Sequence, residues 1–248
     1  IIEKFMKKAL VILSGGQDST TCLFWAINKG YSCSTITFNY NQLHKIEINS
    51  AIKISQLASI KDHEIIDIGP IFDGDSPLTN PNKALEQHSK IEDFPTGIQQ
   101  TFVPARNLLF LSIAANRAYS KNISTIIIGV CQEDFGGYPD CRQDFITSMT
   151  ETISLSLEKK IEILTPVINL KKSEIIKLAN QLGDPCWSSL AYTHTSYDGR
   201  YPPSSEDHAN ILRSKGFEEA GLPDPLVLRA ASEKLIELPK TKNYETKS

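Results

Sequence analysis

The sequence predicts an α/β fold in which helices cover a parallel sheet, with a small helical lobe near the C-terminal end. Along residues 8–183, short apolar runs alternate with longer stretches of helical periodicity, and this alternation is typical of parallel sheets. The 248 residues, of which 40% are hydrophobic, suit one large domain with a buried core. Polar and glycine-rich segments follow several apolar runs, and ligands of such folds bind beyond the carboxyl ends of the strands.

Strands are predicted from short runs rich in branched apolar residues: Lys8–Leu13, Cys33–Phe38, His63–Ile68, Thr125–Val130 and Ile161–Thr165. Helices are predicted from apolar residues at helical spacing: Ser19–Lys29, His44–Leu57, Arg106–Tyr119, Gln143–Leu157 and Lys171–Leu182. We expect Asp18 or Ser19 to cap the first helix and Arg106–Tyr119 to be buried. The long segment Gly69–Gln100 is interpreted as a lid or as a partly mobile segment. The whole chain is interpreted as one domain, with a nucleotide-binding core at 8–183, a C-terminal lobe at 184–228 and a tail at 229–248.

The most informative segment is Ser14–Ser19, which reads Ser-Gly-Gly-Gln-Asp-Ser between the first strand and the first helix. Its two glycines let the backbone turn tightly and approach a ligand closely. The first N–H groups of the following helix have no internal partner, so a phosphate is the expected ligand. The loop lacks the Gly-Lys-Ser/Thr ending of a Walker loop, and its spacing does not fit a dinucleotide fingerprint. The sequence therefore predicts a phosphate site of a different kind.

Composition narrows the class of protein. The net charge of −3 gives no support for non-specific nucleic-acid binding. No signal peptide or transmembrane run is recognised, and Met6 is interpreted as the natural start. The five scattered cysteines argue against a disulfide framework and for a reducing compartment. We expect a cytoplasmic protein that binds neither nucleic acid nor membrane, with Cys22, Cys33, Cys131 and Cys141 as packing residues.

Six segments together resemble one family: Leu13–Ala26, Thr37–Glu47, Phe102–Ala115, Gly129–Ile146, Thr165–Leu178 and Leu212–Pro225. The family is that of the 7-cyano-7-deazaguanine synthases of the queuosine and archaeosine pathways, which belong to the PP-loop ATP pyrophosphatases. The glycine loop alone indicates only the superfamily, whereas Gly-Tyr-Pro-Asp-Cys-Arg at residues 137–142 is far more specific. The resemblance implies a Rossmann-like sheet of the adenine nucleotide alpha hydrolase type.

The resemblance also implies an activity, in which 7-carboxy-7-deazaguanine and ammonia become 7-cyano-7-deazaguanine. The carboxylate attacks the α-phosphorus of ATP to give an acyl-adenylate, ammonia displaces AMP to give the amide, and a second adenylation leads to the nitrile. ATP and Mg²⁺ are the implied cofactors, and a homodimer is the implied assembly. Two alternatives stay open: transfer of the activated acyl group to another amine, such as one on a protein, and a nucleotide-binding module without turnover.

Site residues are assigned from the matching motifs and from side-chain chemistry. The nucleotide is assigned to Leu13, Ser14, Gly15, Gly16, Gln17, Asp18, Ser19, Thr20, Phe38 and Arg106. Asp134 or Asp140 can accept the N–H donors of a guanine-like edge, and Tyr138 or Phe135 can stack on the base. Arg142 can hold the substrate carboxylate through two hydrogen bonds. The residues assigned to the deazaguanine are Gln42, His44, Asn107, Glu133, Asp134, Tyr138, Asp140 and Arg142. Catalytic roles are assigned to Asp18, Arg106, Arg142 and Lys171. Structural roles stay open for Asp18 and Asp140 as helix caps, and for His44 and Lys171 as solvated residues.

The chain departs from the family at the C-terminal lobe, where relatives carry four cysteines that bind a structural Zn²⁺. The corresponding positions fall near Ser196, Ser204, Asp207 and Asn210, and none is a thiol. A closed zinc site needs thiolate or imidazole ligands, and the irregular spacing of His194, His208, Asp207 and Cys186 does not suit one. We therefore expect zinc to be absent and no residue to ligate a metal. Packing and hydrogen bonds should hold the lobe, with help from Tyr192, Tyr197 and Tyr201.

Overall fold

The computed structural model describes residues 7–42, 45–74, 76–80, 82–83, 100–131, 138–196, 199–202 and 208–245. Within them lies a five-stranded sheet of order β3-β2-β1-β4-β5, in which every neighbouring pair is parallel. The strands are β1 (Lys8–Ile12), β2 (Ser32–Asn39), β3 (His63–Asp67), β4 (Thr125–Ile128) and β5 (Glu162–Leu164). The predicted parallel sheet is confirmed, with strand ends shifted by one or two residues.

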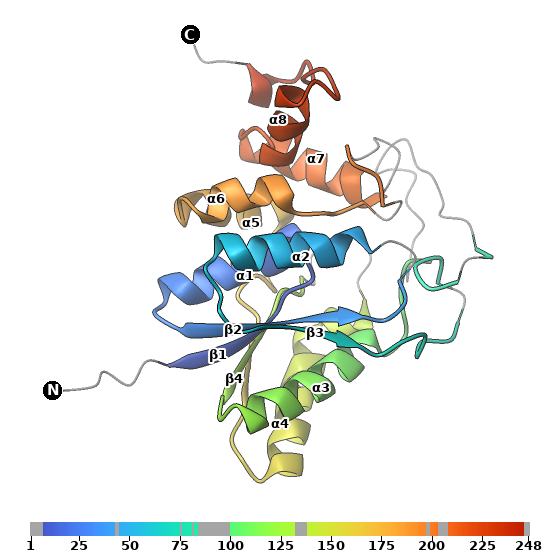
Figure 1. The fold of residues 1–248 in the computed structure, drawn as a ribbon, viewed down its shortest axis with the longest axis vertical. Coiled ribbons are helices and arrows are strands. Elements are labelled where there is room, and N and C mark those ends of the chain that lie inside the picture. Colours follow the sequence, from blue (N-terminus) through green and yellow to red (C-terminus); the bar gives the residue numbers. More distant parts are fainter. Residues whose placement is uncertain are drawn as a thin grey trace, which may run out of the picture.

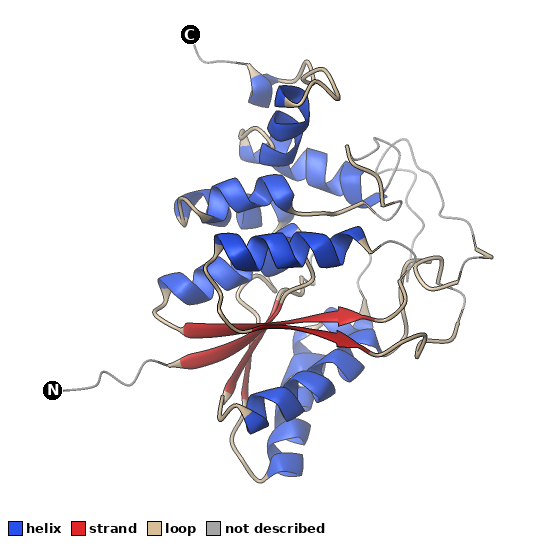
Figure 2. Ribbon diagram, viewed as in Figure 1, coloured by secondary structure: helices blue, strands red, loops and turns tan. Residues whose placement is uncertain are grey.

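Helices cover both faces of this sheet (Figures 1 and 2). One face carries α1 (Gln17–Asn28), α2 (Ile46–Leu57) and α5 (Lys172–Gln181), and the other carries α3 (Arg106–Ser120) and α4 (Gln143–Leu157). The chain after α5 contains α6 (Cys186–Ser189), α7 (His208–Ala220) and α8 (Pro225–Ser232), with the short 3-10 helices η3 (Leu190–Tyr192) and η4 (Lys242–Tyr244). From here on, the C-terminal lobe means this whole part, which joins the predicted lobe and the predicted tail. A further 3-10 helix, η2 (Pro139–Cys141), precedes α4.

The central strand shows why the sequence reads as continuous apolar runs. Ala9 and Val11 of β1 pack into the core beneath α1 and α5, whereas Leu10 and Ile12 pack toward α3 and α4. Because both faces of the sheet are buried here, apolar residues do not alternate with polar ones along the strand. Cys22, Cys131 and Cys141 are buried in these two cores, while Cys33 is only half-buried.

Two predictions about helices are corrected. The first helix begins at Gln17 rather than Ser19, and its N-cap is Gly16 without a side-chain cap, so neither Asp18 nor Ser19 caps it. The reason is that the glycine turn is tight enough for the helix to start directly after it. Helix α3 is buried on one face only, because Leu108 and Tyr119 are 46% and 52% exposed.

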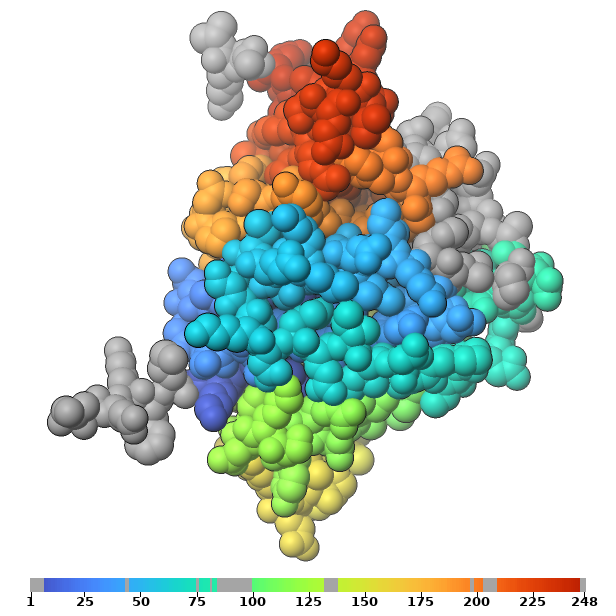
Figure 3. Space-filling model, in the orientation of Figure 1, coloured from blue at the N-terminus to red at the C-terminus, as the bar shows by residue number. Residues whose placement is uncertain are grey.

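The C-terminal lobe lies against the α5 side of the sheet, at the opposite end of the molecule from α4 (Figure 3). Helix α7 packs closely on α5, since a Cβ at Gly216 would lie 2.8 Å from Cγ of Lys172. Among the described residues, no helix is long and apolar enough to cross a membrane. Most of the segment interpreted as a lid, including residues 84–99, lies outside the described residues.

Candidate active site

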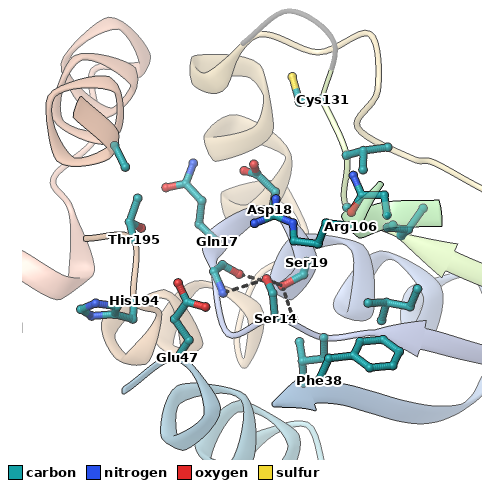
Figure 4. A pocket seen from close by; sticks show the side chains of 18 of the residues that line it. Ser14, Gln17, Asp18, Ser19, Phe38, Glu47, Arg106, Cys131, His194 and Thr195 are labelled. Carbon is teal, nitrogen blue, oxygen red and sulfur yellow. Dashed lines mark hydrogen bonds between the residues drawn. The ribbon is translucent and has the colours of Figure 1, made fainter. Parts of the chain in front are cut away.

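A cavity of about 300 Å³ opens at the carboxyl ends of β1, β2 and β4. It lies where the strand order reverses between β1 and β4, which is the usual ligand position in open parallel sheets. Its walls come from the loop Ser14–Ser19, the end of β2, the first turns of α2 and α3, and the segment His194–Ser196 of the lobe (Figure 4).

The glycine loop is held from two sides. Gly15 has φ +87°, and a Cβ there would overlap the carbonyl oxygen of Glu47 in α2, so only glycine fits. On the other side, the N–H of His194 donates to the carbonyl oxygen of Gly15 at 2.9 Å. Ser14 and Ser19 close the loop, because Ser14 N donates to Ser19 Oγ at 3.2 Å and the two hydroxyls lie 3.0 Å apart. The loop therefore presents the N-terminus of α1 to the cavity in a fixed shape.

Asp18 has one carboxylate oxygen occupied and one without a partner. Its Oδ2 accepts from Nζ of Lys172, the first residue of α5, at 2.8 Å. Its Oδ1 is buried and makes no hydrogen bond. A buried carboxylate oxygen is costly to leave unpaired, so Oδ1 is a candidate ligand for a cation.

Arg106, Tyr40 and Glu47 form a second charged group in the cavity. Arg106 is the first residue of α3, and its guanidinium hydrogen-bonds Tyr40 and attracts Glu47. Burial raises the pKa of Glu47 to about 7, and the attraction of Arg106 only partly offsets this shift. Glu47 as a whole is half-buried, but its carboxyl group lies inside the cavity (Figure 4). Glu47 can therefore take up or release a proton near neutral pH.

Tyr138 lines the cavity just before η2. Its hydroxyl lies 2.6 Å from Thr101 Oγ1, and its ring stacks on Phe102 with centroids 5.5 Å apart. Beside it, Asn107 lines the cavity and is anchored to η2. Its backbone N–H donates to Asp140 Oδ2 at 3.1 Å, and its Nδ2 donates to the carbonyl oxygen of Asp140 at 3.2 Å. The carboxylate of Asp140 thus serves the N-terminus of α3.

Residues 8–221 match the family model described as the queuosine biosynthesis protein QueC. The chain belongs to the QueC family. It is 44% identical over 225 residues to the 7-cyano-7-deazaguanine synthase of Gloeobacter violaceus, covering 89% of this chain and 96% of that protein. It is 41% identical over 221 residues to the synthase of Bacillus subtilis, with 86% and 94% covered. The synthase of Staphylococcus epidermidis strain RP62A is 49% identical over 177 residues, with 71% and 77% covered.

Most site residues predicted from the sequence meet in this one cavity. Those that line it are Leu13, Ser14, Gly16, Gln17, Asp18, Ser19, Phe38, Gln42, Arg106, Asn107 and Tyr138. Those that are described but lie outside its lining are Gly15, Thr20, Asp140, Arg142 and Lys171. His44, Glu133 and Asp134 lie outside the described residues. The binding and catalytic roles assigned to these residues stay predictions.

Several lining residues were not assigned to the site from the sequence. The lysine in the cavity is Lys172, whereas the neighbouring Lys171 contributes its backbone N–H to Oε2 of Glu174 at 2.8 Å. Lys171 was assigned from the sequence, and only the orientation of the first turn of α5 shows that its neighbour Lys172 is the one that lines the cavity. Glu47 was visible as a polar residue near the start of the second helix. The segment His194–Ser196 had no signal in the sequence that linked it to the glycine loop.

The lobe segment that reaches the cavity is fixed by a buried ion pair. Arg213 of α7 donates hydrogen bonds to both carboxylate oxygens of Asp224, from Nε to Oδ2 at 2.6 Å and from Nη2 to Oδ1 at 2.8 Å. Its Nη1 donates to the hydroxyls of Thr193 and Thr195 at 2.8 and 2.9 Å. Arg213 and Asp224 are 2% and 3% exposed. This network holds the strand-like segment 193–195 in place through hydrogen bonds.

A second set of contacts joins α8 to the rest of the lobe. The guanidinium of Arg229 lies 4.7 Å from the ring centroid of Tyr192 and 4.4 Å from that of Tyr201.

Among the described residues, no three His, Cys, Asp or Glu side chains gather as a metal site. Ser196 and Asn210 are buried, whereas Tyr197, Ser204 and Asp207 and the side chain of His208 lie outside the described part of the chain. The expectation that zinc is absent stays a prediction.

Proposed function

We propose that this chain converts 7-carboxy-7-deazaguanine, ammonia and ATP to 7-cyano-7-deazaguanine through acyl-adenylate and amide intermediates. The observation that carries the proposal is that the phosphate loop, Arg106 and Tyr138 face one cavity. A base placed near Tyr138 can therefore direct its carboxylate toward a phosphate on the loop. The names of the similar synthases support the same product.

ATP is proposed to bind with its phosphates on the loop Ser14–Ser19. The N-terminus of α1 supplies unpaired N–H groups and the positive end of the helix dipole. The unpartnered Oδ1 of Asp18 fits Mg²⁺, which prefers oxygen ligands. When bound, Mg²⁺ would neutralise charge on the departing pyrophosphate. Lys172, paired with Asp18 at 2.8 Å, orients that carboxylate and adds positive charge beside the phosphates.

Arg106 is proposed to stabilise the charge that develops on the α-phosphate. It stands at the positive end of α3, where a cation is unfavourable unless an anion neutralises it. Glu47 and a phosphate would both meet that need. Arginine suits this role because its planar group binds phosphate oxygens in pairs. The carboxylate of the substrate can then form its bond to the α-phosphorus as the bond to pyrophosphate breaks.

Glu47 is proposed to accept the proton that ammonia loses. Ammonia forms a C–N bond to the activated carbonyl carbon, the C–O bond to AMP breaks, and AMP leaves with the electron pair. The nitrogen then carries one proton too many. A carboxyl group with a pKa of about 7 in the same cavity can accept it at neutral pH.

The test is to incubate the protein with ATP, Mg²⁺, ammonium and 7-carboxy-7-deazaguanine and to weigh the products by mass spectrometry. We expect AMP, a transient amide and the nitrile, and none of these with the D18N variant. AMP together with an acyl adduct of an added amine, but no nitrile, would favour the conjugation alternative. Absence of AMP would favour a nucleotide-binding module. Light scattering tests the implied homodimer separately.

A further inference from the structure

The side chain of Gln17 is buried in the cavity wall without a hydrogen-bond partner. The residue is 5% exposed, and both Oε1 and Nε2 are buried with no partner. Its side chain lies between Asp18 and the lobe segment that carries Thr195 (Figure 4). Each unmet buried polar group costs about 1–3 kcal/mol. An amide kept in this state indicates a ligand that completes it.

Gln42 shows that a glutamine in this cavity need not remain unsatisfied. It is similarly buried at 7% exposed and also lines the cavity. Its Oε1 accepts from Tyr40 N at 2.9 Å, and its Nε2 donates to the carbonyl oxygen of Phe38 at 3.4 Å. The amide of Gln42 therefore supports the backbone after β2, whereas that of Gln17 is available to a bound molecule.

The two unmet atoms define the chemistry of that molecule. Phosphate oxygens of ATP only accept hydrogen bonds near neutral pH, so they would satisfy Nε2 and leave Oε1 unmet. A ligand that satisfies both atoms has an N–H donor next to an oxygen acceptor. Ammonia beside the substrate carboxyl group has this pattern, and so does the carboxamide that forms from them. Gln17 directly precedes Asp18, on the loop side of the cavity, where the reacting carboxyl group must lie to reach the α-phosphate.

We infer that Gln17 positions the nitrogen in both halves of the reaction, an inference that rests on the proposed function. Its Oε1 accepts an N–H of ammonia as the C–N bond forms, while its Nε2 donates to the substrate oxygen. In the second half, Oε1 holds an N–H of the carboxamide, which leaves the amide oxygen free to form its bond to the α-phosphorus of a second ATP as pyrophosphate leaves. AMP then leaves with the electron pair of the C–O bond, and the nitrogen loses its two protons, one to Glu47 and one to water, as the nitrile forms. Gln17 itself gains and loses no atom.

The test compares Q17M, which keeps the length of the side chain without its hydrogen bonds, with the wild-type protein in steady-state assays. We expect the KM for ammonium to rise about tenfold or more, the size expected for a lost hydrogen bond. The KM for ATP should change little, and free amide should accumulate. Q17E retains the oxygen acceptor, so its KM for ammonium should stay nearer the wild-type value while its added charge raises the KM for ATP. Q56M, at the exposed Gln56 of α2, is the control and should match the wild type.

Other results would overturn the inference. A rise confined to the KM for ATP would make Gln17 a phosphate ligand, and a rise confined to the KM for the deazaguanine would make it a base-reading residue. Wild-type kinetics in folded Q17M would reduce it to a packing residue. If Q17M does not fold, Q17E alone tests the inference. A KM for ammonium in Q17E that rises by the same factor by which kcat falls would contradict the acceptor role of Oε1. Failure of the wild-type protein to form amide or nitrile would instead reject the proposed function, and this is measured first.

Discussion

Lys172 and Asp18 form an ion pair of 2.8 Å in the cavity wall, although they lie 154 positions apart in the chain. The pair joins the first turn of α5 to the first turn of α1. Each side chain is only 19% exposed, so solvent and salt screen the attraction less than at a free surface. The pair fixes the orientation of the carboxylate whose other oxygen faces the proposed cation.

Replacing Lys172 with methionine should impair adenylation. The K172M variant leaves Asp18 with an unbalanced charge beside the phosphates of ATP. Hydrogen bonds to charged groups are worth about 1.5–3 kcal/mol, so we expect kcat/KM for ATP to fall by about 10- to 100-fold. The measurement is AMP formation at varied ATP concentration. K171M changes the neighbouring lysine outside the cavity lining and should have little effect. If K171M is the more damaging variant, the assignment of Lys171 made from the sequence is the better one.

The fold could be predicted from the sequence because its determinants are local. Burial on both faces makes β1 and β4 read as unbroken apolar runs, and the glycine loop joins a strand to a helix within six residues, Ser14–Ser19. Helix α1 begins earlier than predicted because its N-cap, Gly16, has no polar side chain to mark the boundary.

The cavity could be predicted only in part, because some of its wall residues meet only through tertiary packing. Lys172 and Lys171 are equivalent in the sequence until α5 docks against α1. The segment His194–Ser196 meets the loop through the bond from His194 N to the carbonyl oxygen of Gly15, and Arg213 of α7 holds it through Thr195. Glu47 acquires a perturbed pKa from burial near Arg106, which lies 59 positions further along the chain. No local pattern contains these relationships.

Replacing Asp140 with alanine should lower the stability of the fold more than it weakens substrate binding. Its carboxylate accepts from the backbone N–H of Asn107 in the first turn of α3. Loss of such a cap costs about 0.5–2 kcal/mol, so D140A should lower the free energy of unfolding by about 1–2 kcal/mol in chemical denaturation. D144A removes an exposed acidic residue from the first turn of α4 and should cost less. A folded, undamaged D140A with a strongly raised KM for the deazaguanine would support the direct binding role predicted from the sequence.

Arg213 should be the most sensitive position of the C-terminal lobe. Removing one partner of a buried ion pair costs about 3–5 kcal/mol, and R213M would also release the hydroxyls of Thr193 and Thr195. We expect a large loss of stability in denaturant titrations. R117M breaks a half-buried pair in which the side chains of Arg117 and Glu64 are 37% and 32% exposed. This loss should cost about 0–1 kcal/mol. Equal losses of unfolding free energy in R213M and R117M would show that the buried network of Arg213 stabilises the fold no more than the Arg117–Glu64 pair does.

Removal of divalent metal should leave the stability of the lobe unchanged. The described lobe is held by the Arg213–Asp224 pair and by Arg229 between two tyrosine rings. We therefore expect the melting temperature to be the same with and without a strong chelator, and elemental analysis to find no stoichiometric zinc. A structural zinc site contributes folding energy directly. A marked fall in melting temperature on chelation would contradict the assignment of the lobe as zinc-free.

Replacing Glu47 with glutamine should change how stability depends on pH. The pKa of Glu47 is about 7 in the folded protein, against an ordinary value of 4.5. Between these two pH values the unfolded chain has lost the proton of Glu47, whereas the folded protein retains it. The free energy of unfolding of the wild type therefore falls as pH rises from about 4.5 to 7, and this loss stays constant above pH 7. Glutamine does not titrate. E47Q should therefore match the wild type near pH 4 and gain about 1–3 kcal/mol over it at pH 8, while losing ammonia-dependent turnover. The control is E151Q, at an exposed glutamate of α4, whose free energy of unfolding should follow that of the wild type at every pH. A difference in the free energy of unfolding between E47Q and wild type that stays constant from about pH 4 to 8 would contradict the perturbed pKa.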